Sequence, residues 1–201
     1  MPEAEPVRAP ATVPGAGASD LQILLSGEAS MPVTSSQHDR YILHLNHALA
    51  MENALVDHLE KRAAAVPKPD VRQRLLQHRD ETIQHRETVR DCIHSLAGEP
   101  TITKANVQAP ITPGIVGKVM TALESEKEDK LLMEDLADFA VENYEEALYA
   151  GLSLIARNVG YPHHATRFED IRKQERAMAD FIAAHQPDGV REAFPPLEQA
   201  A

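Results

Sequence analysis

The sequence predicts an all-α protein: a four-helix bundle whose two helical hairpins are joined by one long crossover that contains a short extra helix. Three observations lead to this fold. Four long segments repeat apolar residues at the three- and four-residue spacing of an amphipathic helix. Within each pair of segments the connection is only a few residues long, so the paired helices must lie antiparallel. A long loop separates the pairs, and no segment shows the alternation typical of a strand.

The first hairpin is the clearer of the two in the sequence. A stripe of leucines marks its first helix, predicted over residues 36–66: Leu45, Leu49, Leu55 and Leu59. Pro67 ends this helix because proline has no backbone N–H to donate. We expect Asp70 to be the N-cap of the second helix, since Gln73 three residues later completes a capping-box pattern. Gly98 ends the second helix.

The second hairpin follows the long loop. A short helix is predicted over residues 113–124, and Ser125 with Glu128 forms another capping box. This box opens a third long helix over residues 126–158, and the fourth helix is predicted over residues 162–185. Two hairpins joined by one long crossover are the arrangement of ferritin-like bundles, as opposed to simple up-down bundles.

The domain organisation that follows has three parts. Residues 1–35, rich in Pro, Ala and Gly, are expected to form a disordered or extended tail. Residues 36–185 form the bundle, and residues 186–201 form a second tail. An apolar island at residues 21–25 is expected either to lie against the bundle or a neighbouring subunit, or to dock into a larger protein partner.

Composition excludes several classes of function. The 201-residue chain has 20 Lys and Arg against 31 Asp and Glu, a formal charge of −11. Phosphate backbones and anionic lipid repel such a chain, so neither nucleic acid nor a membrane surface is an expected partner. No run approaches the roughly 18 apolar residues of a membrane span. With a single cysteine, Cys92, and no evident secretory signal, we expect a cytoplasmic protein.

The chemical signal is a set of carboxylates placed where the helices should be apolar. Each predicted helix carries one or two near its midpoint: Glu52, Glu81, Glu142 with Glu145, and Glu175. His78 and His85 flank the second of these on the same helical face. At a rise of about 1.5 Å per residue, the carboxylates lie within about one turn of the same level. Because an unpaired buried carboxylate costs several kcal/mol, a layer of them predicts a compensating metal ion.

The residue types favour iron, with manganese as second choice. Carboxylates with one or two imidazoles bind these metals while leaving positions open for oxygen or peroxide. A second ion would need bridging carboxylates, which Glu142 and Glu145 could supply. The lone thiol argues against a structural zinc site.

Each of these residues also has an ordinary explanation. A single glutamate could pair with one of several nearby arginines, namely Arg79, Arg86, Arg172 and Arg176. His78 alone could be a core histidine whose hydrogen bonds are satisfied. The remaining mid-chain histidines are assigned no function: His44, His47, His58, His94, His163 and His164.

Several segments together resemble the YciF/YciE-type ferritin-like stress-response family. They are YILHLNHALAMENALVDHLEKR, LLQHRDETIQHRETV, AVENYEEALYAGL and FEDIRKQERAMADFI, within residues 37–185. The resemblance implies a small, apparently dimeric four-helix bundle related to rubrerythrins and ferritins.

The wider ferritin-like group implies a ligand set, which falls on these positions: Glu52, Glu81, His85, Glu142, Glu145 and Glu175. The chain departs from the group's Glu-x-x-His pattern, because Gln84 stands three residues after Glu81 and Met178 three after Glu175. His85 or His78 could replace the first histidine, and nothing replaces the second. A carboxylate-rich centre is therefore expected, and full ferroxidase activity does not follow.

The resulting hypothesis is a cytoplasmic protein that binds one or two iron ions, or manganese, and oxidises iron or consumes peroxide under stress. Whether it is an enzyme, as a di-iron-type oxidoreductase, is left open. We expect a homodimer or higher homo-oligomer. The alternative is a metal-free helical interaction module whose tail docks a partner and whose carboxylates pair with Arg and Lys across helices. Mineral storage in a cage is less favoured, since the sequence shows no sign of cage contacts.

Overall fold

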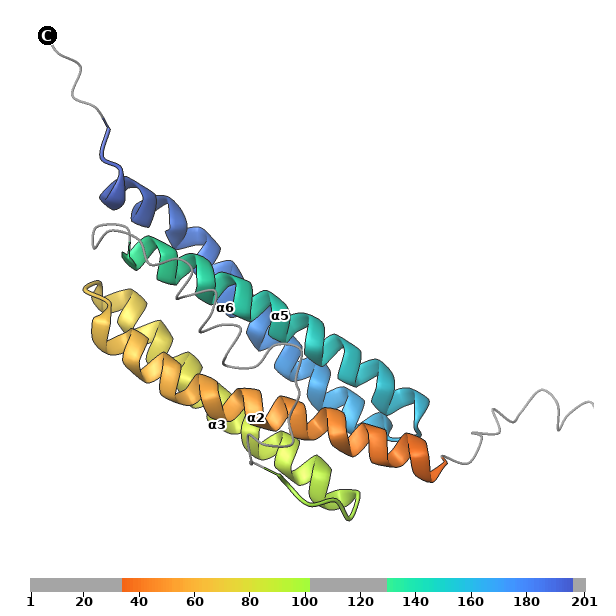
Figure 1. The fold of residues 1–201 in the computed structure, drawn as a ribbon. Helices are drawn as coiled ribbons and strands as arrows, with labels where there is room; N and C mark the ends of the chain where they lie inside the picture. Colours follow the sequence, from red (N-terminus) through yellow and green to blue (C-terminus); the bar gives the residue numbers. More distant parts are fainter. Residues whose placement is uncertain (1–33, 102–129, 197–201) are drawn as a thin grey trace, which may run out of the picture. The chain divides into compact units, whose positions relative to one another are not determined.

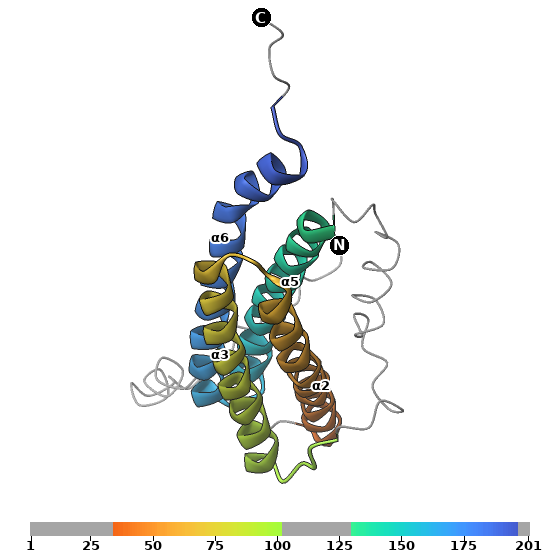
Figure 2. The ribbon, with the colours of Figure 1, turned by 90° about the vertical axis from the view of Figure 1, so that its left-hand side faces the viewer.

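The computed structural model describes residues 34–101 and 130–196, which contain four α-helices and no strand (Figure 1). The helices are α2 (Ser35–Ala65), α3 (Pro69–Ser95), α5 (Lys130–Asn158) and α6 (Pro162–Ala193). Helix α2 packs chiefly against α3, and α5 against α6, as Figures 1 and 2 both show. Further contacts join α2 to α5 and α3 to α6. The predicted all-α four-helix bundle is confirmed.

Helix α2 begins within one residue of the predicted start. Its N-cap is Thr34, whose Oγ1 accepts a hydrogen bond from the backbone N–H of Gln37 at 3.2 Å. In return, the Gln37 side chain accepts the backbone N–H of Thr34 at 3.1 Å. This reciprocal capping box satisfies two donors that the first turn of a helix leaves without a partner.

The predicted N-cap of α3 was wrong. The helix begins at Pro69, with Lys68 as N-cap, and Asp70 lies inside the first turn without a capping hydrogen bond. Proline suits the first helical position because its φ is already helical and its missing N–H would have no partner there. Asp70 instead places its negative charge near the positive end of the helix dipole.

The end of α3 shows why a glycine is needed at position 98. Ala97 adopts a positive φ of 53°, and Gly98 N–H donates to the carbonyl of Ile93 at 3.0 Å. This hydrogen bond is that of a Schellman motif. A Cβ on residue 98 would lie 3.1 Å from side-chain atoms of Ile42 on α2. Glycine therefore lets the α3 terminus approach α2 closely.

The fourth helix is longer than predicted. It was expected to end near His185, but α6 continues through Pro187 to Ala193. A proline inside a helix removes one backbone hydrogen bond. The extension gains an ion pair in return, because Lys68 Nζ lies 2.7 Å from a carboxylate oxygen of Glu192.

Several predictions fall outside the described residues. They are the short helix over residues 113–124, the capping box at Ser125, and most of the N-terminal tail. Within the described part, no helix combines the length and hydropathy that crossing a bilayer requires.

Two apolar clusters form the core of the described bundle. The larger contains residues such as Leu45, Leu49, Val89, Leu152 and Phe168. The smaller contains Leu59, Leu75, Met178 and Ile182, among others. Along α2, α3 and α6, buried polar residues separate the members of one cluster from those of the other, and on α5 the partly buried Phe139 packs against the smaller cluster. The bundle is therefore divided by a polar layer.

Candidate metal centre

The polar layer consists of four glutamates and two histidines: Glu52, His78, His85, Glu142, Glu145 and Glu175. None of the six exposes more than 3% of its surface. All four helices contribute, with Glu52 from α2, both histidines from α3, and the remaining glutamates from α5 and α6. Of the residues that sequence spacing placed at one level, the structure brings these six together.

One group of three possible ligands joins Glu52, His85 and Glu175. Their ligand atoms all lie within 4.8 Å of one another, as an ion between them would require. His85 Nδ1 lies 2.8 Å from Glu175 Oε1 and 4.0 Å from Glu52 Oε2. The group therefore connects α2, α3 and α6.

A second group joins His78, Glu142 and Glu175, again with all ligand atoms within 4.8 Å. His78 Nε2 lies 3.0 Å from Glu142 Oε2 and 3.4 Å from Glu175 Oε2. Glu175 thus belongs to both groups, with Oε1 near one histidine and Oε2 near the other. A carboxylate in this position is a candidate bridge between two metal ions.

Glu81 does not enter either group but holds the outer side of His78. One of its oxygens lies 3.0 Å from His78 Nδ1 and also accepts a hydrogen bond from Arg74. Gln77 donates to its other oxygen. Burial would raise the pKa of Glu81, but His78 and Arg74 outweigh it and lower the pKa to about 2. The ionised Glu81 fixes the proton of His78 on Nδ1, which leaves Nε2 to face the layer.

Gln174 fixes the orientation of His85 in the same way, from outside the layer. Its Oε1 lies 2.6 Å from His85 Nε2, so the histidine donates from that nitrogen and directs Nδ1 toward the carboxylates. Tyr149 orients the third residue of this group, because its hydroxyl donates a hydrogen bond to Glu52 Oε1 and leaves Oε2 to face the layer. Neither Gln174 nor the Tyr149 contact was predicted from the sequence.

The inner atoms of the layer lack hydrogen-bond partners within the described structure. They are Glu52 Oε2, His85 Nδ1, Glu142 Oε2 and both oxygens of Glu175. A neutral imidazole and a carboxylate at 3 Å present lone pairs to each other. Buried polar atoms in native proteins are nearly always satisfied, so the arrangement requires a proton or a cation between these groups.

The pKa values show what the layer does without a metal. Burial, together with nearby Glu175, raises the pKa of Glu52 to about 8. Burial likewise raises the pKa of Glu142 to about 7 and that of Glu145 well above its usual range. The contacts of Glu175 with His78 and His85 overcome the effect of burial and lower its pKa to about 2. The metal-free layer therefore retains protons near neutral pH.

The two histidines also hold protons. Burial alone would lower their pKa, but carboxylates overcome it: Glu142 above all for His78, and Glu175 and Glu52 for His85, so both pKa values are raised. A metal ion would replace these protons, because metal ligands must be deprotonated.

The arginines that could have neutralised the glutamates pair elsewhere. Arg79 binds Asp80, and Arg86 binds Glu87. Arg172 and Arg176 both bind Glu146, the outward neighbour of Glu145. Within the described residues, no Arg or Lys forms an ion pair with a glutamate of the layer. The ordinary explanation by ion pairing thus holds only for Glu81.

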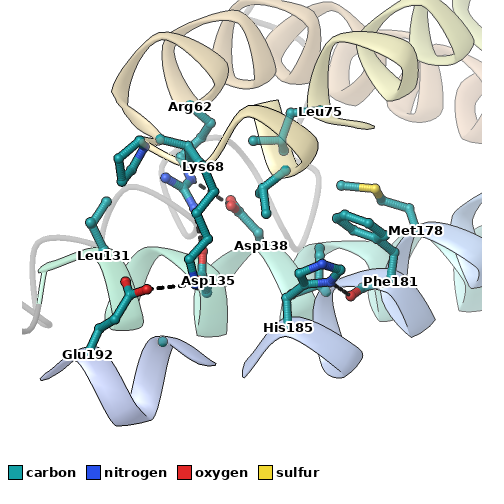
Figure 3. A pocket seen from close by; sticks show the side chains of 15 residues that line it. Arg62, Lys68, Leu75, Leu131, Asp135, Asp138, Met178, Phe181, His185 and Glu192 are labelled. Atoms are coloured by element: carbon teal, nitrogen blue, oxygen red, sulfur yellow. Dashed lines mark hydrogen bonds and ion pairs between the residues drawn. The ribbon is translucent and has the colours of Figure 1, made fainter. Parts of the chain in front are cut away.

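A pocket lies one helical turn from the layer, at the end where α2 connects to α3 (Figure 3). Leu75, Asp138 and Met178 line it, and they stand one turn from His78, Glu142 and Glu175. At its side Arg62 bonds to Asp138, as Figure 3 shows. The pocket contains none of the six residues of the layer.

Fold and site define a class of protein: an all-α, four-helix bundle with a buried carboxylate–histidine layer. The chain belongs to the family described as Domain of unknown function (DUF892), whose model matches residues 36–194. No curated protein matches the chain.

Solved structures agree with this assignment. A protein from Xanthomonas campestris pv. campestris is 26% identical, with a TM-score of 0.65, over 78% of this chain and 95% of that one. The Escherichia coli stress protein YciF is 22% identical, with a TM-score of 0.65, over 79% and 99%. YcfI from Rhodopseudomonas palustris is 19% identical, with a TM-score of 0.62, over 78% and 96%. The predicted resemblance to the YciF-type bundles is confirmed.

Proposed function

We propose that the polar layer binds one or two iron ions, with manganese as second choice, and that the protein oxidises iron or consumes peroxide in a stress response. The observation that carries the proposal is the orientation of the two histidines. Glu81 and Gln174 hold their outer nitrogens, so the inner nitrogens face carboxylate oxygens that lack partners. A metal ion satisfies both kinds of atom at once.

The donor set fits these metals. Each group offers one nitrogen and two carboxylate residues, and no thiolate is near, since Cys92 lies in the larger apolar cluster. Such oxygen-rich sets suit iron and manganese better than zinc. When bound, iron would supply the change of oxidation state by which peroxide or oxygen is reduced.

The residues of the chain supply the surroundings. The two apolar clusters lie on either side of the layer, and the hydroxyl of Tyr149 donates its hydrogen bond to Glu52. Glu145 adds a further carboxylate, whose pKa is raised first by burial and then by the charges of Glu175 and Glu52. It could complete the ligand set of either group. YciF is described as a stress protein, and this supports the stress role proposed for its relative.

The test is anaerobic loading with Fe(II), followed by desalting and elemental analysis. We expect the wild-type protein to retain one or two equivalents, and the Glu175→Gln variant to lose at least tenfold in affinity because both groups share this residue. Glu146→Gln is the matched control: the same change at the neighbour of Glu145 on the outer face, expected to bind as wild type.

Retention of no iron or manganese by the wild-type protein would contradict the proposal and favour the metal-free interaction module. Equal iron retention by Glu175→Gln and wild type would contradict the assignment of the ligands. Circular dichroism of each variant checks that the bundle is folded.

A cytoplasmic homodimer or higher homo-oligomer remains part of the proposal. It is supported by apolar side chains at the surface, among which Leu154 is 64% exposed and Leu43 47% exposed. Light scattering during size-exclusion chromatography measures the oligomeric state directly.

A further inference from the structure

A continuous series of aromatic rings leads away from the metal centre through the larger apolar cluster. From His85 the ring centroids are 6.2 Å to Tyr149, 6.0 Å from Tyr149 to Phe168, and 6.3 Å from Phe168 to His164. His164 in turn lies 6.0 Å from Tyr41. Rings at such spacing are close to contact, and electron transfer between neighbouring groups is fast at short distances.

The series reaches the protein surface. Tyr161, which is partly exposed, stacks on His164 with centroids 5.2 Å apart and planes 14° apart. It also stacks on Tyr41 at 5.9 Å. Beyond it, the exposed ring of His163 lies 6.3 Å away. One end of the series is therefore in the polar layer and the other is accessible to solvent.

Tyr41 and His164 form a buried pair with a defined direction for the proton. Both are 1% exposed, and Tyr41 Oη lies 3.0 Å from His164 Nδ1. Ser95 donates its single hydroxyl hydrogen to the carbonyl of Cys92, so its oxygen must accept from His164 Nε2 at 2.9 Å. His164 Nδ1 is then the bare nitrogen, and the Tyr41 hydroxyl donates to it.

This pair meets the chemical requirement for oxidation of a buried tyrosine. A phenol that loses an electron becomes strongly acidic, so a neighbouring base must accept its proton. Burial, together with the charges of His163 and Arg167, lowers the pKa of His164 to about 4, so this histidine is neutral and able to accept. Packing alone would not require a polar pair here, since Phe and Leu fill an apolar core at less cost.

We propose that Tyr41, with His164 as its proton acceptor, is a redox-active relay that passes electrons between the surface at Tyr161 and the buried metal centre. This inference rests on the proposed function only for its electron acceptor, hydrogen peroxide, which takes up two electrons and two protons to give two waters.

Each turn of the relay moves one electron and one proton. Tyr41 loses one electron through Phe168 to Tyr149 and the layer, its O–H bond breaks, and the proton moves to His164 Nδ1. A ferrous ion in solution then returns one electron through Tyr161 and becomes ferric, and the proton returns from His164 to the Tyr41 oxygen. Two turns deliver two electrons to one peroxide, and the solvent supplies the two protons that complete two waters.

The first test uses the metal-free protein and so does not depend on the proposed function. A photo-excited ruthenium complex with persulfate oxidises the protein from solution, and electron paramagnetic resonance detects the tyrosyl radical. We expect a buried radical that decays more slowly in D₂O. The Tyr41→Phe variant should lose it, whereas Tyr144→Phe, a tyrosine outside the series, should keep it.

The second test adds peroxide to the iron-loaded protein and freezes the sample within milliseconds. A radical at Tyr41 is expected in the wild type. In Phe168→Leu, which removes the ring between Tyr149 and His164, the Tyr41 signal should fall at least tenfold while iron content is unchanged.

The outcomes separate the two proposals. If iron does not bind, the proposed function fails, and the photochemical test still decides the relay. If iron binds but the metal-free radical is the same in Tyr41→Phe and wild type, the relay is overturned while the proposed function stands. A Tyr41 signal in Phe168→Leu equal to wild type would overturn the route through the ring series.

Discussion

At the scale of single residues, two side chains just outside the polar layer determine how its histidines are oriented. His78 has its Nδ1 held by Glu81, and His85 has its Nε2 held by Gln174. Both contacts select the ring nitrogen that faces the layer. Such outer partners orient metal-binding histidines and raise their basicity, and their loss commonly lowers metal affinity about 10- to 100-fold.

Replacement of Glu81 by alanine should therefore weaken one metal position and spare the other. We expect the affinity of the His78 group to fall about 10- to 100-fold because Nδ1 loses its acceptor and the ring its fixed orientation. The His85 group should change little. Calorimetric titration with Fe(II) under anaerobic conditions measures both. Asp80→Ala, at the neighbouring residue paired only with Arg79, is the control. Equal weakening of both positions would contradict this assignment.

The contacts of Glu81 and Gln174 could not be predicted from the sequence. The three-residue spacing placed Glu81 on the face of His78, but the spacing does not show that Arg74 and Gln77 hold its carboxylate outside the layer. Gln174 was not predictable at all. Its partner stands 89 residues away in the sequence, and a glutamine on a polar helix has no distinguishing pattern.

Between elements, one buried cation on α2 binds three carboxylates of α5. Arg62 on α2 binds Glu134 at 2.9 Å, Asp135 at 2.7 Å and Asp138 at 2.6 Å, all on α5. The Arg62 side chain is only 5% exposed. Removing the cation from the centre of a buried ionic cluster disturbs its charge balance, which typically costs about 3–5 kcal/mol.

The Arg62→Met variant should accordingly lose about 3 kcal/mol of unfolding free energy. Hydrogen exchange should increase most in the first turns of α5, where the three carboxylates lie. Urea unfolding and hydrogen exchange with mass spectrometry measure the two effects. Arg79→Met, which breaks only a partly exposed pair with Asp80, should change stability by less than about 0.5 kcal/mol. Equal losses in the two variants would contradict the importance given to the Arg62 cluster.

Helices could be predicted better than their ends. The periodic leucines of α2 determine a helix because burial of a stripe requires that spacing. The start of α3 was misplaced because two rules compete there: Asp70 is a good N-cap, but Pro69 is better at the first helical position. The end of α6 was missed because Pro187 normally stops a helix, whereas Lys68 from another segment stabilises the extension.

For the whole bundle, the proton content of the layer connects stability to pH. The pKa of Glu52 is raised to about 8 and that of Glu142 to about 7, well above those of the unfolded chain. Between about pH 5 and 8 the folded metal-free protein thus holds protons that the unfolded chain has released, so raising the pH favours unfolding. The lowered pKa of Glu175 acts only below pH 4.5 and does not oppose this trend.

We therefore expect the metal-free protein to be less stable at pH 8.5 than at pH 5.5, by on the order of 1–3 kcal/mol. Bound metal should reverse the trend, because it competes with protons and binds more tightly as the pH rises. Urea unfolding at both pH values, with and without Fe(II), measures the effect. In the Glu52→Gln, Glu142→Gln double variant the metal-free slope should flatten. A wild-type protein that gains stability with pH would contradict the protonated layer.

Because the two hairpins share the possible metal ligands, metal supply would affect how long the folded protein survives in a cell. Each possible metal position takes ligands from both hairpins, so a bound ion would link the α2–α3 half to the α5–α6 half. Anything that binds only the folded state increases its population. Iron starvation would then shorten the lifetime of this protein through proteolysis, and its abundance would follow the iron supply even at a constant rate of synthesis.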